Sequence, residues 1–151
     1  MKKNTTKKNS SYLKFRAVNV SDAEILYDLL NNRNFNISNL DKPAYEDHIK
    51  FIENNPYLHW YLIYTNIPVG TFYIQRDNSI GINIENQSDN HVAQIINFIK
   101  NNFLPQKSLA SVIPSCFHIN TPVSNINMIK SLEKNNLTAI QITHKFSDNG
   151  N

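Results

Sequence analysis

The stretch at residues 80–103 constrains the fold more than any other part of the chain. Residues 80–84 alternate isoleucine with Gly81 and Asn83, which is the period of a half-buried strand. From Val92 onward, isoleucines recur at helical spacing as far as Phe103, so one apolar stripe of an amphipathic helix faces a core. A strand, a polar loop and a helix therefore follow one another directly.

The polar loop at residues 85–91 joins this strand to this helix, and Ser88 or Asp89 is placed to cap the helix. The first N–H groups of a helix have no partner within it, and the helix dipole adds positive potential at the same end. The loop therefore predicts a seat for a phosphate group.

Length and composition are those of an ordinary globular protein. The 151 residues are enough to bury a substantial core, and 40% are hydrophobic and 18% charged. The formal net charge is +3, but removing the lysines at positions 2, 3, 7 and 8 leaves −1. We therefore interpret residues 1–11 as a disordered basic tail and not as part of a nucleic-acid-binding face. Residues 147–151 should fray.

No segment has the length and hydrophobicity of a membrane span or of a signal peptide, and a single cysteine, Cys116, excludes an internal disulfide. We expect a cytoplasmic protein with neither a membrane nor a nucleic acid as partner. Cys116 and His118 are too few to hold zinc, and the other histidines show no ligand spacing with them. We therefore expect no metal.

Periodicity, caps and turns predict the remaining elements. Ser21 and Glu24 form a capping box for the first helix, Ser124 is placed to cap the fourth, and residues 135–136 end it. The expected strands are residues 12–18, 58–65, 69–75, 80–84, 109–113 and 138–146; the expected helices are residues 21–32, 41–54, 88–103 and 124–135; residues 114–122 are irregular. This order predicts one α/β domain over residues 12–146, with a mixed, mostly antiparallel sheet flanked by about four helices.

The order of these elements, with paired early helices and a three-strand meander before the central helix, resembles the fold of the GNAT acyltransferases. Residues 15–24, FRAVNVSDAE, are similar to the opening of that family, and residues 45–56 to its second helix. Residues 125–137, NINMIKSLEKNNL, are similar to its fourth helix. The resemblance covers nearly the whole chain after the tail. It implies an N-acetyltransferase that moves an acetyl or other acyl group from acetyl-CoA to the amine of a small molecule.

The resemblance also implies where the site residues lie. The acyl-pantetheine would run along Ile82 and Ile84, with a backbone amide near Ile84 holding the thioester carbonyl. The phosphates of coenzyme A would meet the loop, and the cofactor-binding set is Ile82, Ile84, Asn86, Asn90, His91 and Asn125. Glu85 stands where many members place the general base, and His118 is the alternative. The second helix is similar to that of members that acetylate nucleotide-linked amino sugars, which implies such a sugar as one acceptor.

Asp89 and His91 stand where the family has glycines in its pyrophosphate loop, so this phosphate loop is degenerate. A Cβ crowds the approach of a phosphate, and Asp89 adds negative charge. Two alternatives therefore stay open: a catalytically degenerate binding or assembly module, and an acyltransferase whose donor is acyl carrier protein. A single closing strand also leaves a sheet edge open, which predicts a homodimer.

Overall fold

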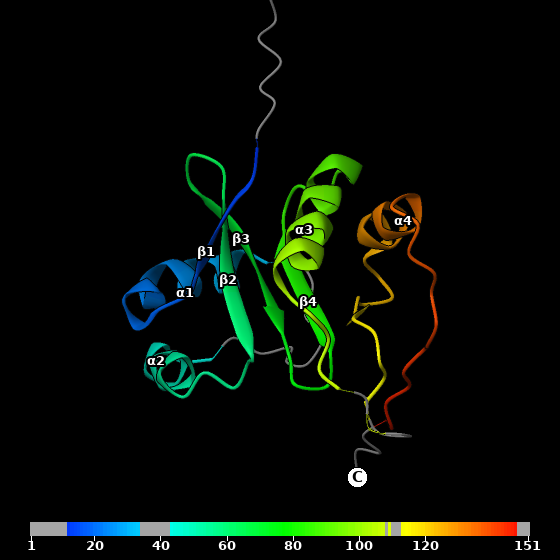
Figure 1. The fold of residues 1–151 in the computed structure, drawn as a ribbon. Helices are drawn as coiled ribbons and strands as arrows, with labels where there is room; N and C mark the ends of the chain where they lie inside the picture. Colours follow the sequence, from blue (N-terminus) through cyan, green and yellow to red (C-terminus); the bar gives the residue numbers. More distant parts are fainter. Residues whose placement is uncertain (1–11, 34–42, 108, 110–112, 148–151) are drawn as a thin grey trace, which may run out of the picture.

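The computed structural model describes residues 12–33, 43–107, 109 and 113–147. Within these residues one sheet has the strand order β1-β2-β3-β4-β5 (Figure 1). The strands are β1 (Lys14–Ala17), β2 (His59–Tyr64), β3 (Pro68–Ile74), β4 (Ser79–Ile84) and β5 (His118–Ile119). The first four pair antiparallel, and β4 pairs parallel with β5. The predicted mixed, mostly antiparallel sheet is confirmed.

Four α-helices of the described residues cover the two faces of this sheet (Figure 1). The helices α1 (Ala23–Asn32) and α2 (Tyr45–Glu53) lie on one face, and α3 (Asp89–Asn102) and α4 (Ile126–Lys134) lie on the other. A short 3-10 helix, η1 (Val20–Asp22), precedes α1. None of the helices in the described ranges has the length and apolar character needed to cross a membrane.

Successive side chains of β3 point to opposite faces of the sheet and enter two different hydrophobic cores. Phe72 and Ile74 are 0% and 1% exposed and pack with residues of α3 and α4, whereas Tyr73 packs toward α1 and α2. Burying a side chain as large as Phe72 stabilises the fold by about 2–3 kcal/mol. Phe98 and Phe103 pack edge-on against Phe72 at centroid distances of 6.0 and 6.5 Å. The stripe predicted for the third helix therefore does meet the sheet.

Two predicted strands differ from the structure. Residues 138–146 form no strand, and all are exposed, Ile142 by 73% and Phe146 by 98%. An alternating pattern makes a strand only beside a partner, and no described strand lies next to this segment. Of residues 109–113, Leu109 and Ile113 form an isolated bridge, and residues 110–112 lie outside the described part. The strand after α3 is instead β5, inside the stretch expected to be irregular.

The predicted capping box of the first helix is wrong by two residues. The Asn19 side chain accepts a hydrogen bond from the Ser21 N–H (2.9 Å), and the Asp22 carboxylate accepts one from the Asn19 N–H (2.8 Å). The box moves because η1 adds a turn ahead of α1. Arg16 holds both carboxylate oxygens of Asp22, at 3.0 and 2.6 Å. Burial alone would raise the pKa of Asp22, but the hydrogen bonds from Arg16 and Asn19 lower it.

The other caps follow the sequence more closely. Ser88 caps α3 as predicted, since its Oγ accepts from the His91 N–H at 3.3 Å. Asn125, and not Ser124, caps α4, because its longer side chain reaches the Met128 N–H at 3.3 Å. Asn136 ends that helix with a φ of 65°, the left-handed conformation that asparagine tolerates.

Asn78 in the turn between β3 and β4 holds the chain that leads to β5. Its side chain is fully buried, at 0% exposed, and its φ is 68°. The amide donates to the carbonyls of Gln106 (3.1 Å) and Pro114 (2.8 Å) and accepts from the Gln106 N–H (2.6 Å). The Asn78 carbonyl also accepts from the His118 N–H at 3.1 Å. This turn therefore fixes the segments on both sides of residues 107–113.

We expect Asn78→Gly to lower the free energy of unfolding by about 2–4 kcal/mol, because glycine keeps the positive φ but loses three buried hydrogen bonds. Urea titration followed by circular dichroism measures the change. Asn136→Gly is the matched control at the other positive φ and should change stability by less than about 0.5 kcal/mol. Equal effects of the two substitutions would show that the side-chain bonds of Asn78 contribute nothing.

Candidate functional site

The two residues of β5 pair only with the first two residues of β4. Ser79 is paired with His118 and Ile80 with Ile119, and the Asn120 N–H donates to the Ile80 carbonyl at 3.0 Å. Beyond that bond, no backbone hydrogen bond among the described residues joins β4 to the chain that follows β5. The chain that follows β5 therefore separates from β4 after Ile80, although β4 continues to Ile84.

The remaining part of β4 has an open backbone edge. Carbonyls at positions 78 and 80 face β5, so strand alternation directs the N–H and C=O groups of Ile82 and Ile84 to the same edge. The Gln87 side chain donates to the Ile84 carbonyl at 3.2 Å. These groups can bind a ligand that enters between the strands, in the manner of an added strand.

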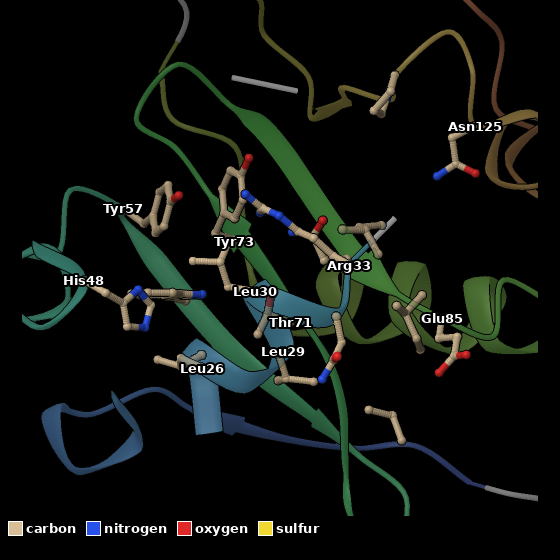
Figure 2. Close-up of a pocket in the computed structure, with 18 of the residues that line it drawn as sticks. Leu26, Leu29, Leu30, Arg33, His48, Tyr57, Thr71, Tyr73, Glu85 and Asn125 are labelled. Atoms are coloured by element: carbon tan, nitrogen blue, oxygen red, sulfur yellow. The ribbon is translucent and has the colours of Figure 1, made fainter. Parts of the chain in front are cut away.

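A cavity of about 580 Å³ adjoins this edge and lies over the α1 and α2 side of the sheet (Figure 2). Its floor includes Thr71 and Tyr73 of β3, and its walls include side chains of α1 and α2. It continues past the end of β4 to Glu85 and Asn125. The cavity thus reaches from the paired early helices to the gap between β4 and β5.

Two stacked tyrosines lie against the sheet in this cavity. The rings of Tyr57 and Tyr73 are parallel, 4.0 Å apart at 11°. Tyr73 occupies its place because Gly81 has no side chain, and a Cβ there would overlap the ring. Burial raises the pKa of both phenols, so they remain neutral hydrogen-bond donors at physiological pH.

Two basic side chains also line the cavity. Arg33, at the carboxyl end of α1, points across it toward Tyr73 (Figure 2). Burial lowers the pKa of Arg33, and the nearby Tyr73 and Tyr57 oppose that effect. Burial likewise lowers the pKa of His48 on α2, which is 6% exposed. The guanidinium nevertheless stays charged, because arginine titrates far above neutral pH.

A second cavity, of about 500 Å³, lies between the loop before α3 and the helix α4. The loop is bonded to that helix: the single hydroxyl proton of Ser131 is shared between the Gln87 carbonyl (2.5 Å) and the Asp89 carboxylate (3.0 Å). Lys134 forms an ion pair with Asp89 at 3.3 Å, and Lys130 lines the same cavity. Glu85 and Gln87 line both cavities and so lie where the two meet.

Only some of the backbone N–H groups at the start of α3 donate a hydrogen bond. The Ser88 N–H donates to the Asn86 side chain at 3.1 Å, and the His91 N–H donates to Ser88. Among the described residues, no acceptor is bonded to the N–H groups of Asp89 and Asn90. Two amides and the positive helix end therefore remain for an anion, and these groups fit a phosphate.

The structure brings some of the predicted site residues together and separates others. Ile82, Ile84, Glu85 and Asn125 line the first cavity, and Glu85 and Asn86 line the second. Asn90 is exposed and His91 is 6% exposed, and neither lines a cavity. His118 pairs with the first residue of β4, about 20 Å of strand away from Glu85.

Other lining residues were not found from the sequence. Arg33, Gln87 and Asn83 carry no motif, and the sequence could only have shown that Arg33 follows an apolar helix stripe. Among the described residues, no group of three or more His, Cys, Asp and Glu side chains could hold a metal ion.

No protein-family model matches the chain, and no curated protein is significantly similar to it. Solved structures do match its fold. A domain from Methanocaldococcus jannaschii DSM 2661 superposes with a TM-score of 0.62 at 16% identity, covering 89% of this chain and 94% of that one.

Two acetyltransferase complexes are also similar. The enzyme AAC(6')-Ib, in complex with paromomycin and acetyl-CoA, has a TM-score of 0.57 at 15% identity, covering 81% of this chain and 80% of that one. RimL, a ribosomal protein α-N-acetyltransferase in complex with coenzyme A, has a TM-score of 0.55 at 16% identity, covering 83% and 80%.

The fold is therefore that of an α/β protein with a mixed sheet that parts at its parallel pair of strands. More particularly, the chain has the GNAT fold, which the sequence resemblance predicted.

Proposed function

We propose that this chain is an N-acetyltransferase of the GNAT type, moving an acetyl or other acyl group from acyl-CoA to the amine of a small molecule. The observation that carries the proposal is the open edge of β4 at Ile82 and Ile84, which faces a gap between two cavities. A donor bound in that gap presents its thioester to an acceptor in the larger cavity. The acetyl-CoA and coenzyme A complexes of similar fold support this arrangement.

The donor would lie with its pantetheine chain along Ile82 and Ile84 and its phosphates in the second cavity. The free amides of Asp89 and Asn90, with Lys130, supply the positive potential there. Asn125, which is 5% exposed and caps α4, positions the helix beside the carrier.

Glu85 is our candidate for the general base. It is exposed, directly follows β4 and lines both cavities, so it would lie where donor and acceptor meet. The amine nitrogen would attack the thioester carbon and give up its proton to Glu85, directly or through water. The new C–N bond replaces the C–S bond, and the coenzyme A thiolate leaves with a proton from solvent. His118, at the far end of β4, is the weaker candidate.

One observation favours the alternative of a degenerate binding module or of acyl carrier protein as the donor. The Asp89 carboxylate stands at the start of α3, where a pyrophosphate would add further negative charge. The ion pair with Lys134 offsets that charge only in part, since both side chains are more than half exposed. Cytoplasmic location and a nucleotide-linked amino sugar as acceptor remain predictions.

We expect acetyl-CoA to bind with a micromolar Kd, about −8 kcal/mol, in calorimetry at low salt. Lys130→Met should weaken binding about fivefold to tenfold by removing a positive charge from the second cavity, and Asp89→Asn should strengthen it by a similar factor. Lys100→Met, in the last turn of α3, is the matched control and should have no effect.

Absence of saturable binding to both the natural chain and Asp89→Asn would contradict coenzyme A as the donor. Binding by Asp89→Asn alone would show that the fold once suited coenzyme A and that this chain has lost its use.

We expect Glu85→Gln to slow acetyl transfer by about 10²–10⁴-fold while leaving the Kd for acetyl-CoA unchanged, because the amide cannot accept the proton. The rate of acetyl transfer is measured as thiol release from acetyl-CoA with a panel of primary amines. His118→Gln is the matched comparison. A larger loss from His118→Gln than from Glu85→Gln would reassign the base.

We also propose a homodimer formed by strand addition. Residues 138–147 are exposed throughout, including the apolar side chains of Ile140 and Ile142. β5 leaves its outer edge without a described strand. Light scattering after gel filtration should give twice the chain mass of 17.4 kDa. Ile140→Lys with Ile142→Lys should shift it to a monomer, and Thr143→Lys is the control. A monomeric natural chain would contradict the dimer.

A further inference from the structure

Arg33 differs from the other two arginines of the chain in its surroundings. Arg16 is bonded to Asp22 at 2.6 Å and to the Tyr64 hydroxyl at 2.9 Å, and Arg76 is exposed in a turn. The Nε atom of Arg33 is buried without a hydrogen-bond partner among the described residues. This arginine is thus half-buried and lines the larger cavity.

No carboxylate of the described residues neutralises this guanidinium. The ion pairs found within 4.0 Å are Arg16 with Asp22 and Lys134 with Asp89. Asp47 and Glu85 line the same cavity, but neither lies within that distance of Arg33. A partly buried guanidinium without a charged partner loses hydration that no other group of the described residues replaces. A cavity that keeps one is suited to a ligand that supplies the opposite charge.

The neighbours of Arg33 are hydrogen-bond donors. The hydroxyls of Tyr57 and Tyr73 have no partner among the described residues, and Thr71 and Asn83 add polar groups to the cavity lining. Guanidinium and hydroxyl donors together match an oxyanion, which a planar guanidinium binds through two parallel hydrogen bonds. Leu26, Phe51 and Trp60 add apolar surface to a lining that also includes the carboxylates of Asp47 and Glu85.

We propose that Arg33 binds an oxyanion of the acceptor, so that the acceptor is an amine carrying a carboxylate or a phosphate. In Figure 2 Arg33 lies between the stacked tyrosines and Glu85, so an anion held there leaves the amine free to reach Glu85. The role in transfer rests on the proposed function, but the anion site itself does not. The same charge disfavours polycationic acceptors such as the paromomycin bound by AAC(6')-Ib.

The test measures binding by calorimetry without acetyl-CoA, so that a failed transfer reaction leaves its outcome unaffected. The probes are matched pairs: phenylalanine against phenylalaninamide for the carboxylate, and phosphoethanolamine against ethanolamine for the phosphate. We expect one anion-bearing probe to bind at least about tenfold more tightly than its partner that lacks the anionic group. The pair that shows the preference identifies the oxyanion.

Arg33→Met should abolish that preference, and Arg33→Lys should keep only part of it, because lysine retains the charge but loses the bidentate fork. Arg76→Met is the matched control and should keep the full preference. Thermal unfolding checks that each variant is folded. No preference in the natural chain, or a preference that survives in Arg33→Met, would overturn the proposal.

If Arg33 instead formed an ion pair with a carboxylate of this chain, the binding test would give a different result. Asp41 lies outside the described residues and is the carboxylate closest to Arg33 in sequence on that side. If Arg33 served an ion pair with Asp41, Asp41→Asn would lower the melting temperature as much as Arg33→Met does, and neither would change anion preference. That result would overturn the proposal, whereas we expect Asp41→Asn to retain anion binding.

Discussion

The buried amide of Asn78 determines where the fifth strand can begin, and the shape of the site follows from that position. Its three side-chain hydrogen bonds hold Gln106 and Pro114, and its carbonyl receives the His118 N–H. The parallel pair is therefore anchored at the start of β4 and nowhere else along it. With the anchor at one end and Asn125 bonded into the start of α4, the chain between them leaves the sheet. The rest of β4 therefore has no described strand on the edge that faces away from β3.

The loop before α3 contains no glycine and is held by contacts with α4. Asp89 brings a charge that would be unfavourable beside phosphates, but its carboxylate is bonded to Ser131 and Lys134 of α4. Asn135 also donates to the Asp89 carbonyl at 3.1 Å. Asp89 thus ties α3 to α4 and adds negative charge beside the free amides of the same helix start. Any anion bound there depends on two amides, the helix dipole and Lys130.

The sequence predicted what local periodicity and capping control, and it failed where distant segments decide. The β2 to β4 meander and the third helix were predictable because alternation, turns and Ser88 act within a few residues. The strand at 138–146 was wrong because its alternating residues specify a strand only if a neighbour is present. The pairing of β5 depends on hydrogen bonds from Asn78 to carbonyls 28 and 36 residues away in sequence. The sequence around His118 contains no local signal for these bonds. Glu85 and Asn125 were placed on the cavity by a resemblance, whereas Arg33 had no local signal.

The two cavities meet at Glu85 and Gln87, and basic side chains lie on both sides of this junction. The smaller cavity has lysines on its α4 wall, and the larger has Arg33 beneath the early helices. Each compartment therefore attracts an anionic group to its far side, and a carboxylate stands between them. A ligand with an anion at one end and a reactive group at the other would be oriented in either compartment with its reactive group toward the junction. Two such ligands, one in each cavity, would meet beside the edge of β4 at Ile82 and Ile84.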